Sequence, residues 1–324
     1  MAFNKFLVAI SLLFFGKTYA QVDDNSPTYR NIGSNKYFRI HYDNDFFTNS
    51  DYYYSQGISL EFVHPAIHKF FLTKLLIQPA KAETKFGIAL NDFGYTPTSI
   101  SSNEILFGDR PFAGTLYLKT FAIATNVAKQ RRISSAISTG ILGPAAGAKK
   151  MQTDIHHWLD NITPKGWQHQ IRNDVIINYQ IDYEQQIWGF KNLVLLNAAA
   201  QLQADTLKDK LRTGVNFMIG KLNNPYRSSI TGNPVKKQFS LYVYGAPNLN
   251  LIGYDATLQG GVFNSSSPYT IAAKNIERIT FQANVGLIID VGKLNLEYCQ
   301  SYLTREFTTG NFHRWAGIKV GFLF

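Results

Sequence analysis

Most of the chain consists of segments in which apolar and polar residues alternate. In one of them Val175, Ile177 and Tyr179 alternate with Asn178 and Gln180. A period of two is typical of a β-strand with one apolar and one polar face. Such segments recur at 37–44, 54–63, 83–92, 113–127, 132–142, 171–188, 192–204, 211–221, 238–254, 276–290, 293–304 and 312–324.

The last segment and the even number of segments predict how the strands are arranged. The chain ends with Ala316, Ile318, Val320, Phe322 and Phe324 on one strand face. An even number of antiparallel strands, apolar outside and wet inside, is typical of bacterial outer-membrane barrels. We therefore predict an all-β fold, a transmembrane antiparallel β-barrel of about 12 strands that forms one domain from residue 21 to residue 324.

The first twenty residues read as an export signal. A basic start at Lys5 is followed by an apolar run at 6–15 and a small-residue site that ends at Ala20. These are the parts of a secretory signal peptide, and we expect cleavage after Ala20. No other stretch is long enough for a transmembrane helix, so the mature chain would cross the outer membrane with strands.

An even strand count also predicts sidedness, because both termini then lie on the periplasmic side. Periplasmic turns are then expected at 129–132, 189–191 and 290–292. Two further links on that side are long for such turns, at 64–82 and 222–237. Within the first long link, residues 68–76 suggest a short amphipathic helix. The outward segments are 45–53, 93–112, 143–170, 205–210, 255–275 and 305–311.

Charge and composition narrow the partners. The chain has 32 Lys and Arg against 22 Asp and Glu, a net charge of +10, and 14% aromatic residues. An exported chain meets little nucleic acid, so an anionic membrane surface rich in phosphorylated glycolipid is the better partner. Aromatic residues fit the interfacial girdles of a barrel. Cys299, the single cysteine, has no internal disulfide partner and is predicted to lie in the barrel wall.

The outward segment 143–170 departs from the strand pattern. Met151, Ile155 and Trp158 or Leu159 recur at helical spacing, which predicts a short α-helix over residues 145–159. Residues 161–164, Asn-Ile-Thr-Pro, would end it.

That helix carries the most informative candidate for catalysis. Gln152 and His156 are four residues apart and share one helix face. Histidine is well suited to take a proton from water near neutral pH. The adjacent His157 lies about 100° around the helix and off the face of Gln152. A single histidine in a loop is more commonly an ordinary surface residue.

Oxygen-bearing side chains gather at the outer ends of the first two strands. Asn44 and Asp45 end the first strand, and Ser55 begins the second with the phase of Gly57, which predicts that it faces the lumen. Two hard oxygen donors beside a hydroxyl suit Ca²⁺. The alternative for such a sequence is a solvated turn.

Arg110 lies in the outward motif Gly-Asp-Arg-Pro-Phe-Ala-Gly at 108–114. Glycine and proline are typical of a tight turn through which the chain re-enters the barrel wall, and in such a turn Asp109 and Arg110 would pair locally. The functional alternative is an arginine that binds a lipid phosphate of the substrate.

Strand order brings these candidates to one rim of the barrel. A Ca²⁺ ion held there would polarise an ester carbonyl while His156 activates a water. No Gly-x-Ser-x-Gly sequence is present, which disfavours a serine nucleophile. The residues concerned are Asn44, Asp45, Ser55, Arg110, Gln152 and His156.

As a set, these motifs resemble the outer-membrane lipid A 3′-O-deacylases, the LpxR family. The resemblance implies a twelve-stranded barrel with its site between wall and loop helix, and Ca²⁺-dependent hydrolysis of the ester-linked 3′-acyloxyacyl group of lipid A in the outer leaflet. The motifs are Asn44-Asp45, Tyr54-Ser55-x-Gly57, residues 108–114, Gly143-Pro144 followed by Gln152 and His156, and Gly166-Trp167-Gln168-x-Gln170.

The resemblance also assigns roles. His156 matches the water-activating histidine, Gln152 the helix glutamine, Asn44 and Asp45 the polar pair of strand one, and Ser55 the hydroxyl of strand two. This chain departs from the family at residues 99–103, which lack a basic cluster, and at 160–161, where an acidic position lacks a clean match.

Two further expectations concern partners. The barrel-assembly machinery would recognise the C-terminal strand, and the protein would be a monomer. The competing functions are an outer-membrane phospholipase and a porin or adhesin without enzymatic activity.

Overall fold

The computed structural model describes residues 24–45, 52–226 and 239–324. The predicted signal peptide at 1–20, most of the link at 222–237 and part of the outward segment 45–53 lie outside these residues. Among those described, no helix is long and apolar enough to cross a membrane.

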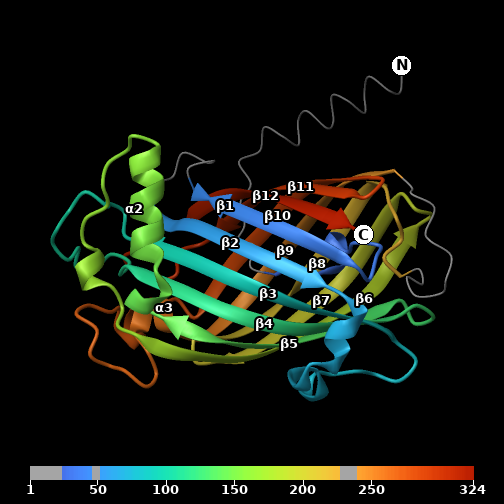
Figure 1. Ribbon diagram of the computed structural model, residues 1–324, viewed down its shortest axis with the longest axis horizontal. Coiled ribbons are helices and arrows are strands. Elements are labelled where there is room, and N and C mark those ends of the chain that lie inside the picture. The colour runs from blue at the N-terminus through green and yellow to red at the C-terminus, as the bar shows by residue number, and fades with distance from the viewer. Residues whose placement is uncertain (1–23, 46–51, 227–238) are drawn as a thin grey trace.

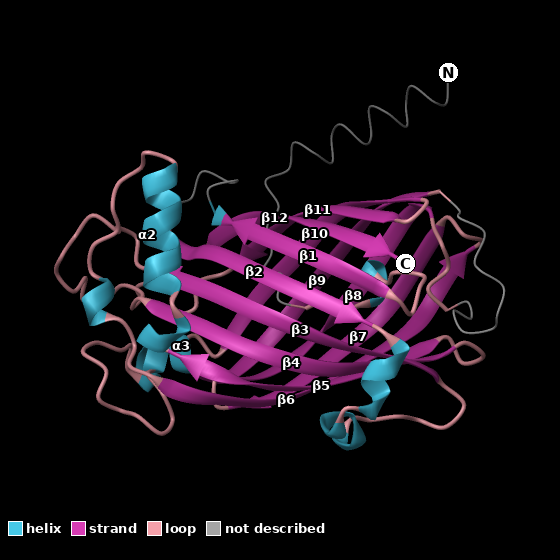
Figure 2. Ribbon diagram, in the orientation of Figure 1, coloured by secondary structure: helices cyan, strands magenta, loops and turns pink. Residues whose placement is uncertain are grey.

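Twelve antiparallel strands form one closed barrel (Figures 1 and 2). Each strand pairs with its neighbours in sequence, and β1 closes the ring against β12, where Asp43 lies opposite Gly317. The predicted twelve-stranded barrel is confirmed. The strands are β1 (Tyr37–Asn44), β2 (Tyr53–Val63), β3 (Glu83–Thr96), β4 (Ala113–Asn126), β5 (Arg131–Leu142), β6 (Asp174–Phe190), β7 (Val194–Asp205), β8 (Lys208–Lys221), β9 (Ser240–Asp255), β10 (Ile279–Val291), β11 (Leu294–Leu303) and β12 (His313–Leu323).

The wall has an apolar exterior and a polar interior. On alternating positions of β3 and β4, Leu90 and Leu118 are exposed outside, whereas Asn91 and Tyr117 are buried in the lumen. This arrangement is the inverse of a soluble protein and suits lipid outside the wall. Cys299 is a wall residue, as predicted, and its thiol contacts the Gly317 carbonyl in the buried interior.

The two ends of the barrel differ. β1 begins and β12 ends at one end, here the turn end, where most links are short. The long link there carries the 3₁₀ turns η3 (Pro65–Lys69) and η4 (Phe71–Leu75) instead of the single amphipathic helix predicted at 68–76. Phe70 has an extended conformation, which separates the two turns.

The opposite end, here the helix end, carries the long loops. Helix α2 (Ala148–Trp158) confirms the helix predicted at 145–159. It begins later because Pro144–Ala146 forms the 3₁₀ turn η5 and Gly147 has a left-handed backbone, with φ +86°. No sequence pattern predicted α3 (Ala256–Gln259), which is too short to show a periodicity, or the turns η6 (Trp167–His169) and η7 (Ala273–Asn275).

Residues 24–32, here the lumen segment, fill part of the barrel interior, and no sequence pattern predicted this. Thr28, in the 3₁₀ turn η1 (Thr28–Arg30), donates from its backbone N–H to Glu184 at 2.7 Å. Arg30 pairs with Glu297 of β11 at 2.8 Å. Both partners lie on the polar face of their strands, so the segment satisfies charges that the lumen would otherwise leave buried and unpaired.

Candidate functional site

Helix α2 packs on the exterior of the barrel wall. Its first residue, Ala148, covers a pair of glycines, Gly94 of β3 and Gly114 of β4, which are register partners. A Cβ added at Gly114 would lie 2.6 Å from the Ala148 Cβ, and one at Gly94 would lie 3.8 Å from it. Gly94 lies on the same strand face as the exposed Leu90, and Gly114 lies on the same face as the exposed Leu118. The helix therefore rests on the membrane-facing side, and in Figure 1 it extends from β4 toward the ends of β2 and β1.

Gln152 and His156 lie on this helix with different surroundings. Gln152 is only 4% exposed, and its Oε1 accepts a hydrogen bond from Trp167 Nε1 at 2.7 Å. Trp167 is fully buried, so it fixes the helix to the loop beneath it. His156 is half-buried, whereas His157 is exposed. The predicted shared face of Gln152 and His156 is therefore the face toward the protein.

The ring of His156 is oriented by the main chain. Its Nδ1 lies 2.7 Å from the carbonyl oxygen of Ile162. A carbonyl can only accept, so in this hydrogen bond Nδ1 carries the proton and a neutral ring keeps its lone pair on Nε2. Asp160 has a left-handed backbone, with φ +52°, and returns the chain toward the helix. The Ile162 carbonyl thus orients the imidazole ring of His156.

Ser55 faces the exterior, so the predicted lumen orientation is wrong. The pairing of β2 with β3 shifts by one residue between Tyr54 and Gln56, which makes Ser55 the extra residue of a β-bulge. Its Oγ lies 2.6 Å from Thr96 Oγ1, and Thr96 lies on the same exterior face of β3 as Gly94. A bulge inverts the phase of all residues beyond it, and an alternation count cannot detect this.

Asn44 and Asp45 lie at the end of β1. Asn44 donates from Nδ2 to Tyr42 Oη at 3.2 Å and shares the alternation of the exposed Ile40. Asp45 follows directly and is buried. Because Asp43 is the register partner of Gly57 on β2, Asn44 and Ser55 occupy neighbouring positions on adjacent strand ends.

Gln56 belongs to the same surface and was missed. It is 2% exposed, and its Nε2 has no hydrogen-bond partner among the residues that the structure describes. Its side chain lies over Gly94, next to Ala148 of α2. The only available signal was its place between Ser55 and Gly57 in the second motif.

Arg110 does not lie on this surface, and its burial does not favour the predicted role as a substrate contact. It is 2% exposed, pairs through Nη1 with Glu306 and donates from Nη2 to Thr257 Oγ1 at 2.7 Å. Its guanidinium lies 4.5 Å from the ring centre of Tyr95. Arg110 therefore joins three loops inside the barrel mouth.

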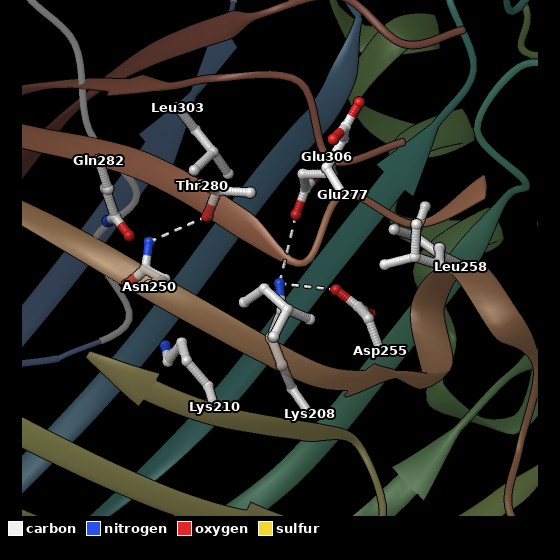
Figure 3. A pocket seen from close by; sticks show the side chains of 12 residues that line it. Lys208, Lys210, Asn250, Asp255, Leu258, Glu277, Thr280, Gln282, Leu303 and Glu306 are labelled. Carbon is white, nitrogen blue, oxygen red and sulfur yellow. Dashed lines mark hydrogen bonds and ion pairs between the residues drawn. The ribbon is translucent and has the colours of Figure 1, made fainter. Parts of the chain in front are cut away.

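Through Glu306, Arg110 belongs to a network of charges, and Figure 3 shows Glu306 together with Lys208 and Asp255. Lys208 contacts Asp255 at 2.6 Å and Glu306 at 3.3 Å. Burial alone would lower the pKa of Arg110, but Glu306 and Asp255 raise it above its ordinary value. Burial alone would raise the pKa of Glu306, but Arg110 and Lys208 hold it well below its ordinary value. The network therefore stays charged and ties the loops together.

Two cavities among the described residues are too small for a lipid. The one beside Lys208 and Asp255 has a volume of about 10 Å³, and one beside Asp24 and Arg212 about 40 Å³. Spaces of this size hold a few water molecules. Among the described residues, Asn44 and Ser55 lie on the exterior face of the wall, on which helix α2 also packs.

The donor chemistry at the strand ends fits a hard cation. Asn44, Asp45 and Ser55 offer an amide oxygen, a carboxylate and a hydroxyl, the ligand types that Ca²⁺ takes. Among the described residues, no group of three or more His, Cys, Asp or Glu side chains is placed to hold a metal ion.

Comparison with known proteins gives one match over nearly the whole chain. A family model described as "Outer membrane protein LpxR" matches residues 6–324. No curated protein matches the chain.

Solved structures with a similar fold are also known. LpxR from Salmonella typhimurium superposes with a TM-score of 0.72 at 17% identity, over 89% of this chain and 100% of that one. The β domain of the Bordetella autotransporter BrkA gives a TM-score of 0.47 at 8% identity, over 90% of this chain and 100% of that one. At such identities a likeness shows the fold alone, and the first of these structures shares the barrel.

Proposed function

The chain belongs to the LpxR family of outer membrane proteins, and on this premise we propose that it is a Ca²⁺-dependent lipid A 3′-O-deacylase. One observation carries the proposal. Helix α2 holds Gln152 and His156 against the exterior of the wall, where a lipid diffusing in the membrane reaches them without entering the barrel. The helix end, in this proposal, faces outward, toward the leaflet that contains lipid A.

His156 is the general base of the reaction. Its Nδ1 is engaged by the Ile162 carbonyl, so Nε2 takes the proton of the attacking water. A main-chain carbonyl can fix the tautomer and the ring plane as an acidic side chain would. Gln152 holds the adjacent helix turn in place through Trp167.

Asn44, Asp45 and Ser55 would hold the cation. When bound, Ca²⁺ supplies polarisation of the ester carbonyl and stabilises the developing oxyanion. Protein side chains provide one carboxylate in this set, so water and substrate oxygens would complete the six to eight ligands typical of Ca²⁺. An ester is more reactive than an amide, so the 3′ ester is hydrolysed and the amide-linked chains remain.

Apolar side chains beside the base suit acyl chains. Trp158 is 82% exposed, and Leu159 and Ile162 are also exposed around the end of α2. Exposed apolar surface of this kind marks a lipid or partner contact. The net charge of +10 favours an anionic lipid such as lipid A.

The lumen argues against the alternative of a passive pore. The lumen segment is largely buried and bonded to Glu184 and Glu297, so the described interior is filled with polar contacts. Recognition by the barrel-assembly machinery and the monomeric state remain predictions.

The substrate test separates the proposal from a phospholipase. Purified protein in detergent with Ca²⁺ is given lipid A and, separately, glycerophospholipid, and the products are weighed by mass spectrometry. Loss of the 3′-acyloxyacyl mass from lipid A alone supports the proposal. Release of fatty acid only from glycerophospholipid would replace it with phospholipase activity.

A further inference from the structure

Behind the exterior site, the lumen face of the same strands carries a buried polar cluster. The Tyr54 hydroxyl donates to Asp43 Oδ1 at 2.7 Å, and His41 Nε2 lies 3.3 Å from Asp43 Oδ2. All three side chains are at most 1% exposed. They face the lumen, so none of them can touch a lipid outside the wall. The hydrogen-bonded pair Asp43 and Tyr54 is called the lumen-side clamp below.

The sheet leaves space for this clamp on both sides. The two register partners of Asp43 are glycines, Gly57 on β2 and Gly317 on β12. A Cβ at Gly57 would lie 1.9 Å from Tyr54 Oη and 2.2 Å from Asp43 Oδ1. A Cβ at Gly317 would lie 2.7 Å from Asp43 Cβ. Glycine weakens a strand interior and marks a close approach, so two glycines here indicate a clamp that the fold accommodates at a cost.

Each member of the clamp directly precedes a candidate cation ligand. Asp43 precedes Asn44 and Tyr54 precedes Ser55. Successive side chains of a strand point to opposite faces, so a bond on the lumen face fixes the backbone that carries the next side chain outside. The constraint matters most at Ser55, because a bulge residue lacks a ladder partner and Tyr53 beside it has a positive φ of 72°.

We propose that the lumen-side clamp is a positioning pair that sets the spacing of Asn44 and Ser55 across the wall. This inference rests on the proposed function, since it gives Asn44 and Ser55 their role as ligands. Without the Tyr54 hydroxyl, the Asp43 carboxylate loses a charge-assisted hydrogen bond and the two strand ends lose their link on the lumen face. The spacing between the two oxygen ligands on the exterior, Asn44 and Ser55, is then no longer fixed.

The test compares two substitutions that each remove one buried tyrosine hydroxyl. Tyr54→Phe keeps the ring, which packs against Trp315 with centroids 4.8 Å apart. Tyr242→Phe is the control, because its hydroxyl donates to the Tyr29 carbonyl at 2.9 Å elsewhere in the same lumen. Both should show the mobility of a folded barrel on unheated gels.

Three readouts should separate them. With Tyr54→Phe, the Ca²⁺ concentration for half-maximal deacylation should rise roughly tenfold or more, the range of a lost hydrogen bond to a charged group. Calorimetric Ca²⁺ binding should weaken in parallel. Hydrogen exchange should accelerate in peptides that cover Asn44 and Ser55. Tyr242→Phe should leave all three unchanged.

Substitutions at Asp43 distinguish positioning from a general loss of packing. Asp43→Asn keeps an acceptor oxygen for Tyr54 and should keep most of the affinity, whereas Asp43→Leu should match Tyr54→Phe. Combining Asp43→Leu with Tyr54→Phe should be no worse than either alone, because the pair acts as one unit. Additive losses, or a Tyr54→Phe protein that behaves like Tyr242→Phe, would overturn the inference. If wild-type protein leaves lipid A intact, the proposed function fails, while the exchange comparison at Asn44 and Ser55 still decides the clamp.

Discussion

Replacing Gly114 with alanine should strongly reduce activity without unfolding the barrel. The new Cβ would lie 2.6 Å from the Ala148 Cβ, whereas unstrained carbon atoms meet at about 3.5–4.0 Å. Backbone hydrogen bonds to β3 and β5 hold strand β4 in place, so the helix α2 would be displaced from the wall by about 1 Å. A displacement of that size in a catalytic group can cost roughly 10²-fold in rate. We therefore expect about a hundredfold slower release of the acyl chain from lipid A.

The paired glycine provides the control. A Cβ at Gly94 would meet Gln56 Cγ at 3.4 Å and Ala148 Cβ at 3.8 Å, which are ordinary contacts. Gly94→Ala should therefore keep most of the activity. Acyl release is measured by mass spectrometry with equal amounts of protein that migrates as a folded barrel. Wild-type activity in Gly114→Ala would refute the placement of α2 on the exterior wall.

Three other outcomes follow from the structure. His156→Ala should lose deacylation while His157→Ala retains most of it, since only His156 is oriented toward the protein; the reverse result in the same assay would reassign the base. Chelation should stop turnover, and added Ca²⁺ should restore it. The Asp45→Ala protein should need more Ca²⁺ for turnover or be inactive. Full turnover after exhaustive chelation would remove the cation from the mechanism. Deleting residues 24–32 should raise single-channel conductance in planar bilayers above that of the wild-type protein. An unchanged conductance would show that the wall side chains alone close the lumen.

Most of the fold could be predicted from the alternation of apolar and polar residues along the chain. The segments at 37–44 and 313–323 could be located from alternation alone, because lipid outside and water inside impose a period of two on every strand. Helix α2 was predictable because Met151 and Ile155 follow a different period. The lumen segment was not, since its order comes from partners such as Glu297 that lie far away in sequence.

The orientation of the candidate site residues could not be predicted from alternation, and their roles stay predictions. Gln152 and His156 share the helix face toward the protein, as their spacing predicts, and Asn44 lies on the exterior face of β1. The exterior position of Ser55 depends on one inserted residue, which leaves no trace in an alternation count. The burial of Arg110 depends on Glu306, almost two hundred residues away in sequence, so a local pattern cannot distinguish it from a substrate contact.

The mass of lipid A in living cells tests the central claim most directly. Lipid A is extracted from outer membranes of bacteria that contain either the wild-type chain or the His156→Ala chain at equal levels, and both samples are weighed by mass spectrometry. The structure predicts a species lacking the 3′-acyloxyacyl group in the wild-type sample only. Identical lipid A in the two samples, with both barrels folded, would contradict a deacylase site on the exterior wall beneath α2.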